Sequence, residues 1–122
     1  MGYVLGIDIG TTLIAAAVFE AERAEIVQLG MRAASVPSIV YVDGATVLTG
    51  DAAARRGVRD PDLVVREFKR RIGDPVPLMI GGAPLSAESV FARQLRATYD
   101  TGVERQGRVP DAVVVTHAAN WG

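Results

Sequence analysis

The sequence predicts an α/β fold in which a mixed sheet is interrupted by an inserted α+β segment. Short apolar segments near the start have the length of strands, the middle carries helix-type spacing with capping residues, and residues 112–115 form an almost wholly apolar run. Because such runs are typical of strands buried on both faces, we expect a central strand there. We predict one domain, residues 1–122, with core strands in about 1–36 and 109–122 and an inserted subdomain at about 37–108.

The first strands surround a glycine-containing turn. Residues 3–8 and 14–19 have the composition of two short strands, and the segment Gly10-Thr11-Thr12 between them predicts a tight turn. Residues 25–29 are expected to form a third strand. The start of the chain is therefore a hairpin whose tip carries hydroxyl groups.

A second hairpin and a helix are expected next. Residues 39–42 and 46–48 flank Asp43-Gly44, a dipeptide that favours a tight hairpin turn. Residues 51–58 are rich in alanine and arginine and predict a short helix.

Residues 60–73 predict a second helix. Asp60 can cap it, Pro61 occupies the first helical position, where its missing N–H costs nothing, and Gly73 is placed to end it. Apolar residues four positions apart would form its buried stripe: Val64, Phe68 and Ile72.

The proline- and glycine-rich residues 75–84 predict a loop or a short β excursion. Ser86 can cap a longer helix through about residue 105, and Pro110 ends that region. The helix is expected to bury a stripe that contains Phe91, Leu95, and Thr98 or Tyr99.

Composition excludes several classes of function. The chain is 49% hydrophobic and 22% charged with a formal net charge of −1, so it is expected to be globular, with no electrostatic reason to bind nucleic acid or an anionic membrane. It has no cysteine, which is consistent with a reducing, cytoplasmic location. We expect no signal peptide, because Asp8 interrupts the first apolar run, and no membrane helix.

The segment from Gly6 to Thr12 is the sharpest local signal for chemistry. Gly10 lets the backbone approach a ligand closely, and the N–H groups and hydroxyls of Thr11 and Thr12 can surround phosphate oxygens. Asp8 ends a strand and could hold a hydrated Mg²⁺ ion, which prefers carboxylate, phosphate and water oxygens. The alternative is an ordinary hairpin turn with a capping aspartate.

This segment resembles the first phosphate loop of the superfamily that contains actins, sugar kinases and heat-shock 70 chaperones. A second block favours the chaperones, because residues 37–41, Gly50-Asp51-Ala52-Ala53, Asp60-Pro61 and 68–73 resemble that family in order and spacing. Residues 113–121 resemble the family's closing strand, so the resemblance covers the chain from Tyr3 onward.

The resemblance implies the first lobe of an actin-like ATPase (ribonuclease H-like) fold, with ATP or ADP and Mg²⁺ as ligands. By the same resemblance, Lys69, the only lysine, would reach the γ-phosphate, Leu13 would contribute mainly its backbone, and Asp8 would hold Mg²⁺ through water. The intact protein would hydrolyse ATP and bind client polypeptides and co-chaperones. The second phosphate loop would lie beyond Gly122, so this chain alone is expected to be inactive.

One departure from the family keeps a different function open. Ala118 replaces the proline that the family uses to couple the nucleotide state to peptide binding, and His117, the only histidine, precedes it and is expected to be structural. The alternative is a nucleotide-sensing or scaffold module of a larger regulatory protein. A sugar kinase is the third hypothesis, which the second block disfavours.

The last predicted strand lies close to Trp121 and Gly122, which suggests a truncated lobe. A buried parallel strand normally has a neighbour on each side. If residues 112–115 lack their outer neighbour, the exposed edge could pair with another chain and produce a dimer.

Overall fold

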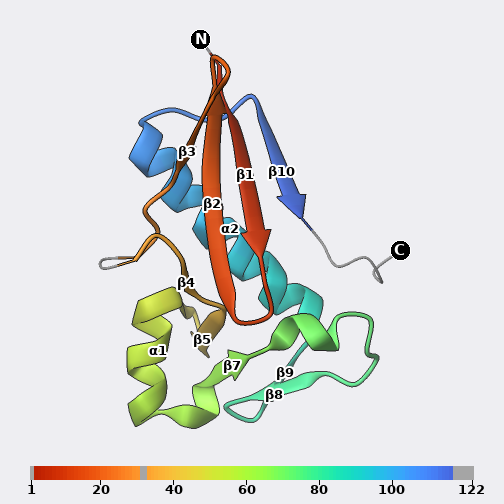
Figure 1. Cartoon of the computed structure of the whole chain (residues 1–122). Helices are drawn as coiled ribbons and strands as arrows, with labels where there is room; N and C mark the ends of the chain where they lie inside the picture. The colour runs from red at the N-terminus through yellow and green to blue at the C-terminus, as the bar shows by residue number, and fades with distance from the viewer. Residues whose placement is uncertain (1, 31–32, 117–122) are drawn as a thin grey trace.

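The computed structural model describes residues 2–30 and 33–116 as a mixed α/β structure (Figure 1). His117, Ala118 and Trp121, which the sequence singles out, lie outside the described residues. Within the described part, the main sheet has five strands in the order β10-β1-β2-β3, and β4 also pairs with β2. These strands are β1 (Val4–Ile9), β2 (Leu13–Glu20), β3 (Arg23–Ile26), β4 (Val36–Pro37) and β10 (Ala112–Thr116).

The sheet is mixed because β10 returns beside β1 in parallel. β1 and β2 form the predicted antiparallel hairpin, with Ile9 opposite Ile14 at its tip. β10 pairs with β1 in a register that places Thr116 beside Asp8. The third strand starts two residues earlier than predicted, after a turn in which Ala21 and Glu22 adopt left-handed backbone angles.

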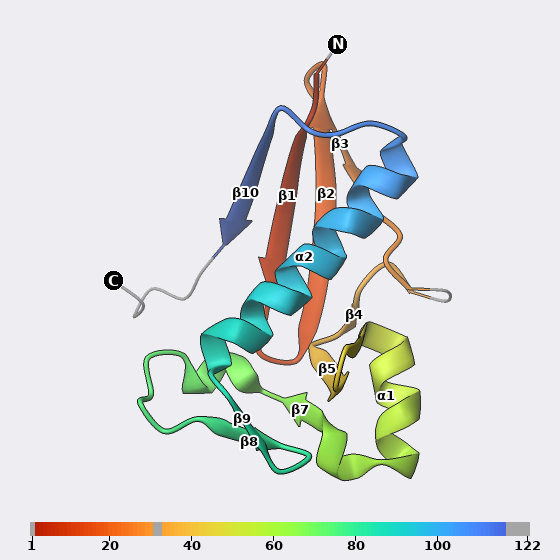
Figure 2. The ribbon, with the colours of Figure 1, turned by 180° about the vertical axis from the view of Figure 1, so that it is seen from behind.

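The helix α2 (Ala87–Gln106) covers one face of the main sheet (Figure 2). It begins as predicted, because the Ser86 hydroxyl accepts a hydrogen bond from the Ser89 N–H at 3.1 Å. Alternation along β1 and β2 directs one set of side chains toward this helix. The buried residues of that core include Leu5, Ile7, Ile9, Ile14, Ala16 and Val18, packed against Phe91, Leu95 and Tyr99 of the helix.

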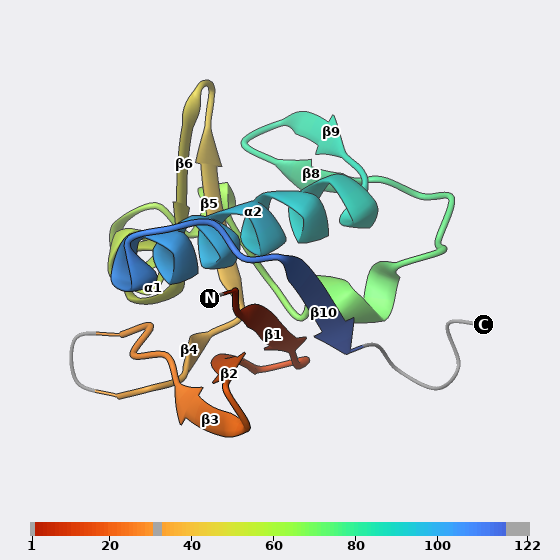
Figure 3. The ribbon, with the colours of Figure 1, turned by 90° about the horizontal axis from the view of Figure 1, so that it is seen from above.

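No helix of the described residues covers the opposite face of the main sheet (Figure 3). Phe19, Ile26 and Val114 are 48%, 69% and 57% exposed there, around an apolar hollow of about 320 Å³. The prediction that residues 112–115 are buried on both faces is therefore wrong for the described chain. β10 has β1 as its only strand partner among the described residues, and only its Val115 is half-buried, against the main core. The prediction of a dimer through this edge is untested.

The segment between β4 and α2 forms a second, smaller region. β5 (Ile39–Asp43) pairs with β6 (Thr46–Thr49) and β7 (Val64–Arg66), and α1 (Gly50–Arg59) packs beside them. β8 (Leu78–Ile80) and β9 (Ala83–Leu85) form the short β excursion that the sequence predicts. Phe91 of α2 contacts the cores of both regions, and Figure 3 shows α2 running between the main sheet and the β8–β9 hairpin.

The predicted helix over residues 60–73 is wrong. The segment is divided into a 3-10 turn at Pro61–Leu63, the strand β7 and a second 3-10 turn at Phe68–Arg71. Val64 and Val65 are β-branched and pair with β5, which favours the extended backbone. Glu67 then takes a left-handed conformation with φ of 53°, which a continuous helix does not allow. Asp60 precedes only one short turn that begins at Pro61, and its side chain makes no capping hydrogen bond there, so the predicted cap is also wrong.

A contact at the far end of the sheet fixes the return of the chain into β10. The Tyr3 hydroxyl donates to the Arg108 carbonyl at 2.7 Å, and the Asp111 N–H donates to the Tyr3 carbonyl at 2.8 Å. Burial raises the pKa of the Tyr3 phenol, Tyr99 raises it further, and Arg108 partly offsets both. Because β10 enters at a fixed position, its last residue, Thr116, arrives beside Asp8.

Candidate functional site

The candidate site lies where the tip of the β1–β2 hairpin meets the second region. Asp8 is the penultimate residue of β1 and its side chain is exposed. The Thr116 hydroxyl donates to Asp8 Oδ1 at 2.6 Å, a bond that joins residues 108 positions apart. Thr116 therefore orients the carboxylate. Thr116 is not among the residues predicted from the sequence, although a hydroxyl at the end of an apolar strand parallel to β1 is a usable signal.

The turn itself is closed by its own backbone. The Gly10 N–H donates to the Leu13 carbonyl at 2.8 Å, and a Cβ atom built on Gly10 would lie 2.8 Å from that same oxygen. Glycine is required here because backbone, which cannot move aside, fills the space. Thr12 and Leu13 are exposed and Thr11 is half-buried, so the outer side of the turn faces solvent.

Ser38 holds this turn from the second region. Its hydroxyl donates to the Gly10 carbonyl at 2.8 Å, and its backbone N–H donates to the Thr12 carbonyl at 2.9 Å. The residue is 3% exposed and directly follows β4. Ser38 is not among the site residues predicted from the sequence. Its signal is a hydroxyl between Pro37 and a run of buried apolar residues, where a polar group needs a partner.

Lys69 also reaches the hairpin. Its Nζ donates to the Ile9 carbonyl at 2.5 Å, although 60 residues separate the two in sequence. The side chain is half-buried, and its neighbour Phe68 is 1% exposed and anchors the 3-10 turn in the core of the second region. The structure therefore brings the Lys69 ammonium group to the backbone of Ile9, the residue that follows Asp8 in β1.

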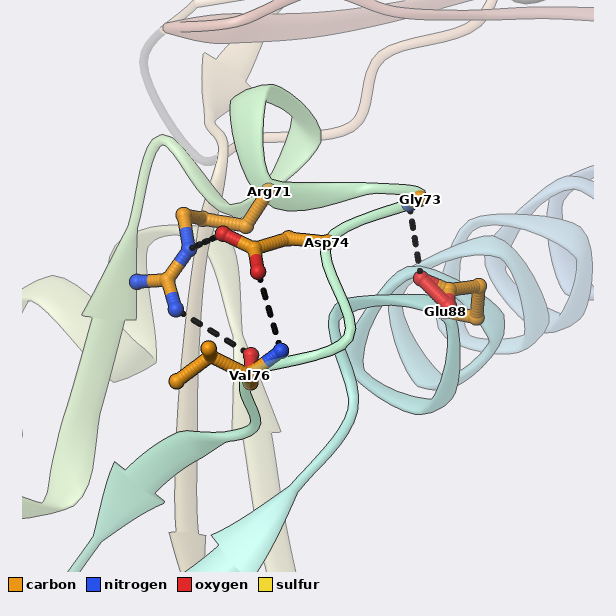
Figure 4. Close-up of polar contacts among 5 residues, drawn as sticks. All are labelled: Arg71, Gly73, Asp74, Val76 and Glu88. Carbon is orange, nitrogen blue, oxygen red and sulfur yellow. Dashed lines mark hydrogen bonds and ion pairs between the residues drawn. The ribbon is translucent and has the colours of Figure 1, made fainter.

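A network of polar contacts fixes the loop that follows Lys69 (Figure 4). Asp74 accepts hydrogen bonds from Arg71 Nε at 3.1 Å and from the Val76 N–H at 2.9 Å. The Gly73 N–H donates to Glu88 Oε1 at 3.2 Å, which ties the loop to the first turn of α2. The Val76 bond lowers the pKa of the Asp74 carboxyl, against an opposing effect of desolvation, and Arg71 lowers it further.

The arrangement suits an anion. Donors from the second region occupy the carbonyl oxygens of Ile9, Gly10 and Thr12, so these partial negative charges are already paired. The backbone N–H groups of a tight turn and a nearby ammonium group are the usual partners of phosphate oxygens. The tip of the β1–β2 hairpin contains the predicted site residues Asp8 and Gly10 to Leu13, and Lys69 contacts it at Ile9.

The residues also fit a hydrated magnesium ion. Among the described residues, no three acidic, histidine or cysteine side chains come together as a metal cage. Mg²⁺ commonly keeps several waters and uses one or two carboxylates together with substrate phosphates. Asp8 is an exposed carboxylate at the correct end of β1 for that role.

A Gly10→Ala substitution is expected to lower the free energy of unfolding by about 1–3 kcal/mol, because the new methyl group meets the Leu13 carbonyl. Chemical denaturation measures this change. Thr12→Ala is the control, since Thr12 is exposed in the same turn. Equal stability of the two variants would contradict the close approach at Gly10.

The Asp74 network predicts a pH dependence. The folded-state pKa is lowered, so the contacts persist above the pKa of the unfolded chain and are lost as the pH falls through the folded-state pKa. The amide chemical shift of Val76 is therefore expected to inflect below the usual aspartate range, and Asp74→Asn should abolish the inflection. An inflection at the ordinary aspartate value or above it would disprove the contact.

Comparison with known proteins identifies the family. A family model described as Hsp70 protein matches residues 4–78, more than half of the chain. The chaperone protein DnaK of Ureaplasma urealyticum is 31% identical over 113 residues, which cover 93% of this chain and 19% of that protein. DnaK of Halobacterium salinarum is 31% identical over 114 residues, covering 93% and 18%. The chain thus spans about a fifth of the length of these curated relatives, and it belongs to the Hsp70 family.

Proposed function

We propose that this chain is the N-terminal lobe of the ATP-binding domain of a heat-shock 70-like molecular chaperone. The β1–β2 turn binds the phosphates of ATP or ADP, together with Mg²⁺. One observation carries the proposal: the ammonium group of Lys69 meets the backbone of β1 at Ile9, directly after Asp8. A cation and a carboxylate thus lie at the β1 end of a turn whose N–H groups can surround phosphate oxygens, which supports the proposal.

Each residue has a chemical role in this proposal. Gly10, Thr11, Thr12 and Leu13 bind phosphate oxygens through backbone N–H groups and the threonine hydroxyls. Asp8 holds Mg²⁺ through a bound water, and the ion supplies positive charge beside the phosphates. Lys69 lies at the γ-phosphate, where phosphoryl transfer requires neutralised charge and a water held in line. Thr116 keeps the Asp8 carboxylate oriented.

The activity of the whole protein follows from family membership and is part of the proposal. It hydrolyses ATP in order to set its affinity for unfolded client polypeptides, acts with co-chaperones, and works in the cytoplasm during stress. In the described part of the chain, no helix has both the length and the apolar character needed to cross a membrane.

A second candidate is a nucleotide-sensing or scaffold module without chaperone activity. The observation that favours it is Ala118, because alanine lacks the fixed φ of the proline found in the family's coupling switch. The segments that accompany this chain in its gene product separate the two hypotheses. A β-rich peptide-binding domain favours the chaperone, and unrelated segments favour the sensor.

Lys69→Ala in the natural polypeptide that carries this chain is expected to lower ATP turnover at least about tenfold while ATP affinity changes little, because the lost charge acts mainly in the transition state. Steady-state hydrolysis and nucleotide titration measure the two quantities. Arg70→Ala is the control, since Arg70 is a neighbouring cation whose side chain is 69% exposed. Equal ATP turnover in the unsubstituted protein and both variants would contradict the role of Lys69. If the unsubstituted protein showed no turnover, the hypothesis of a nucleotide-sensing module would be favoured.

Residues 1–122 alone are expected to bind nucleotide weakly and to show no measurable turnover, because the proposed phosphate contacts come from one turn and one lysine. A coupled phosphate-release assay on the purified chain measures this. Repeated turnover at the rate of the natural polypeptide would overturn the division of the site between two lobes.

A further inference from the structure

The tip of the β1–β2 hairpin depends on Ser38, a residue that is not part of the hairpin. Its hydroxyl donates a hydrogen bond to the Gly10 carbonyl at 2.8 Å, and its backbone N–H donates to the Thr12 carbonyl at 2.9 Å. Both acceptors belong to the turn proposed to bind phosphate. Ser38 therefore contacts that turn on both sides of Thr11, which is half-buried.

Electrostatics gives this contact a functional consequence. A carbonyl oxygen directed at a phosphate would repel it, whereas a carbonyl held by a donor on the inner side leaves the outer side of the turn to its N–H groups. Ser38 is 3% exposed, so its hydroxyl has little access to water and needs a protein acceptor. The Gly10 carbonyl supplies that acceptor, and the bond holds both partners.

The position of Ser38 also matters. It lies at the junction where β4, which pairs with β2, passes into β5 of the second region. Ser38 thus lies in the connection between the two regions and contacts the turn. The orientation of the turn is consequently tied to the place where the second region begins.

We propose that Ser38 is a positioning residue for phosphate binding, which acts by holding the Gly10 carbonyl away from the ligand. The inference rests on the proposed function and deepens it. Ser38 touches no phosphate itself. Its effect is specific to the phosphate groups of a nucleotide and leaves recognition of the nucleoside unchanged.

The test compares Mg·ATP and adenosine as probes of the natural polypeptide that carries this chain. Ser38→Ala removes the hydroxyl and keeps the backbone bond to Thr12. Thr101→Ala is the matched control, because the Thr101 hydroxyl donates to the Ala97 carbonyl at 3.1 Å within α2, away from the turn. Ser38→Thr retains a hydroxyl donor. Isothermal titration gives the dissociation constant of each probe for each variant.

We expect Ser38→Ala to raise the dissociation constant of Mg·ATP by about fivefold to tenfold, the equivalent of one net hydrogen bond. Adenosine affinity should not change, Thr101→Ala should match the parent for both probes, and Ser38→Thr should recover most of the Mg·ATP affinity. If Ser38→Ala lost equal affinity for Mg·ATP and for adenosine, the role of Ser38 would be merely structural. If it lost affinity for neither probe, Ser38 would have no role in binding. Either result overturns the inference and leaves the proposed function intact. If the unsubstituted protein bound Mg·ATP no more tightly than adenosine, the inference and the proposed function would both be overturned.

Discussion

The contact between the second region and the backbone of the β1–β2 turn is the interaction on which the site depends. Ser38 and Lys69 come from different segments, yet each donates to a carbonyl at the tip, Gly10 and Ile9 respectively. A tight turn exposes polar backbone groups that must be paired wherever water is excluded. Here the second region donates the hydrogen bonds that these backbone carbonyls need. The turn and the second region are therefore joined by polar contacts.

The rest of the fold brings these donors into place. Phe68 is buried in the core of the second region, and this burial fixes the position of the adjacent Lys69. The Asp74 network fixes the loop that follows, and Glu88 joins that loop to α2. On the main sheet, Tyr3 fixes the entry to β10, and the parallel register then places Thr116 at Asp8. Apolar packing therefore sets the positions of these segments, and a small number of hydrogen bonds orient the side chains of the candidate site.

Local sequence signals predicted the elements that depend on local chemistry. The Gly10 turn, the Ser86 cap and the hairpin at Gly44 all follow from residues within a few positions. Residues 60–73 were mispredicted as a helix because the pairing of Val65 with Val40, a tertiary contact, outweighed the spacing of the apolar residues. Ser38 and Thr116 were missed for a related reason, since their partners lie 28 and 108 residues away.

In the proposed function, the outer side of the β1–β2 turn binds phosphate, while Ser38 and Lys69 hold the backbone carbonyls of Gly10 and Ile9. The most direct measurement is an experimental structure of the natural polypeptide with Mg²⁺ and ADP. We predict phosphate oxygens within hydrogen-bond distance of the N–H groups at residues 11–13, with the Ser38 hydroxyl still donating to the Gly10 carbonyl. Phosphates bound elsewhere, or a turn in which the Gly10 carbonyl faces the ligand, would contradict it.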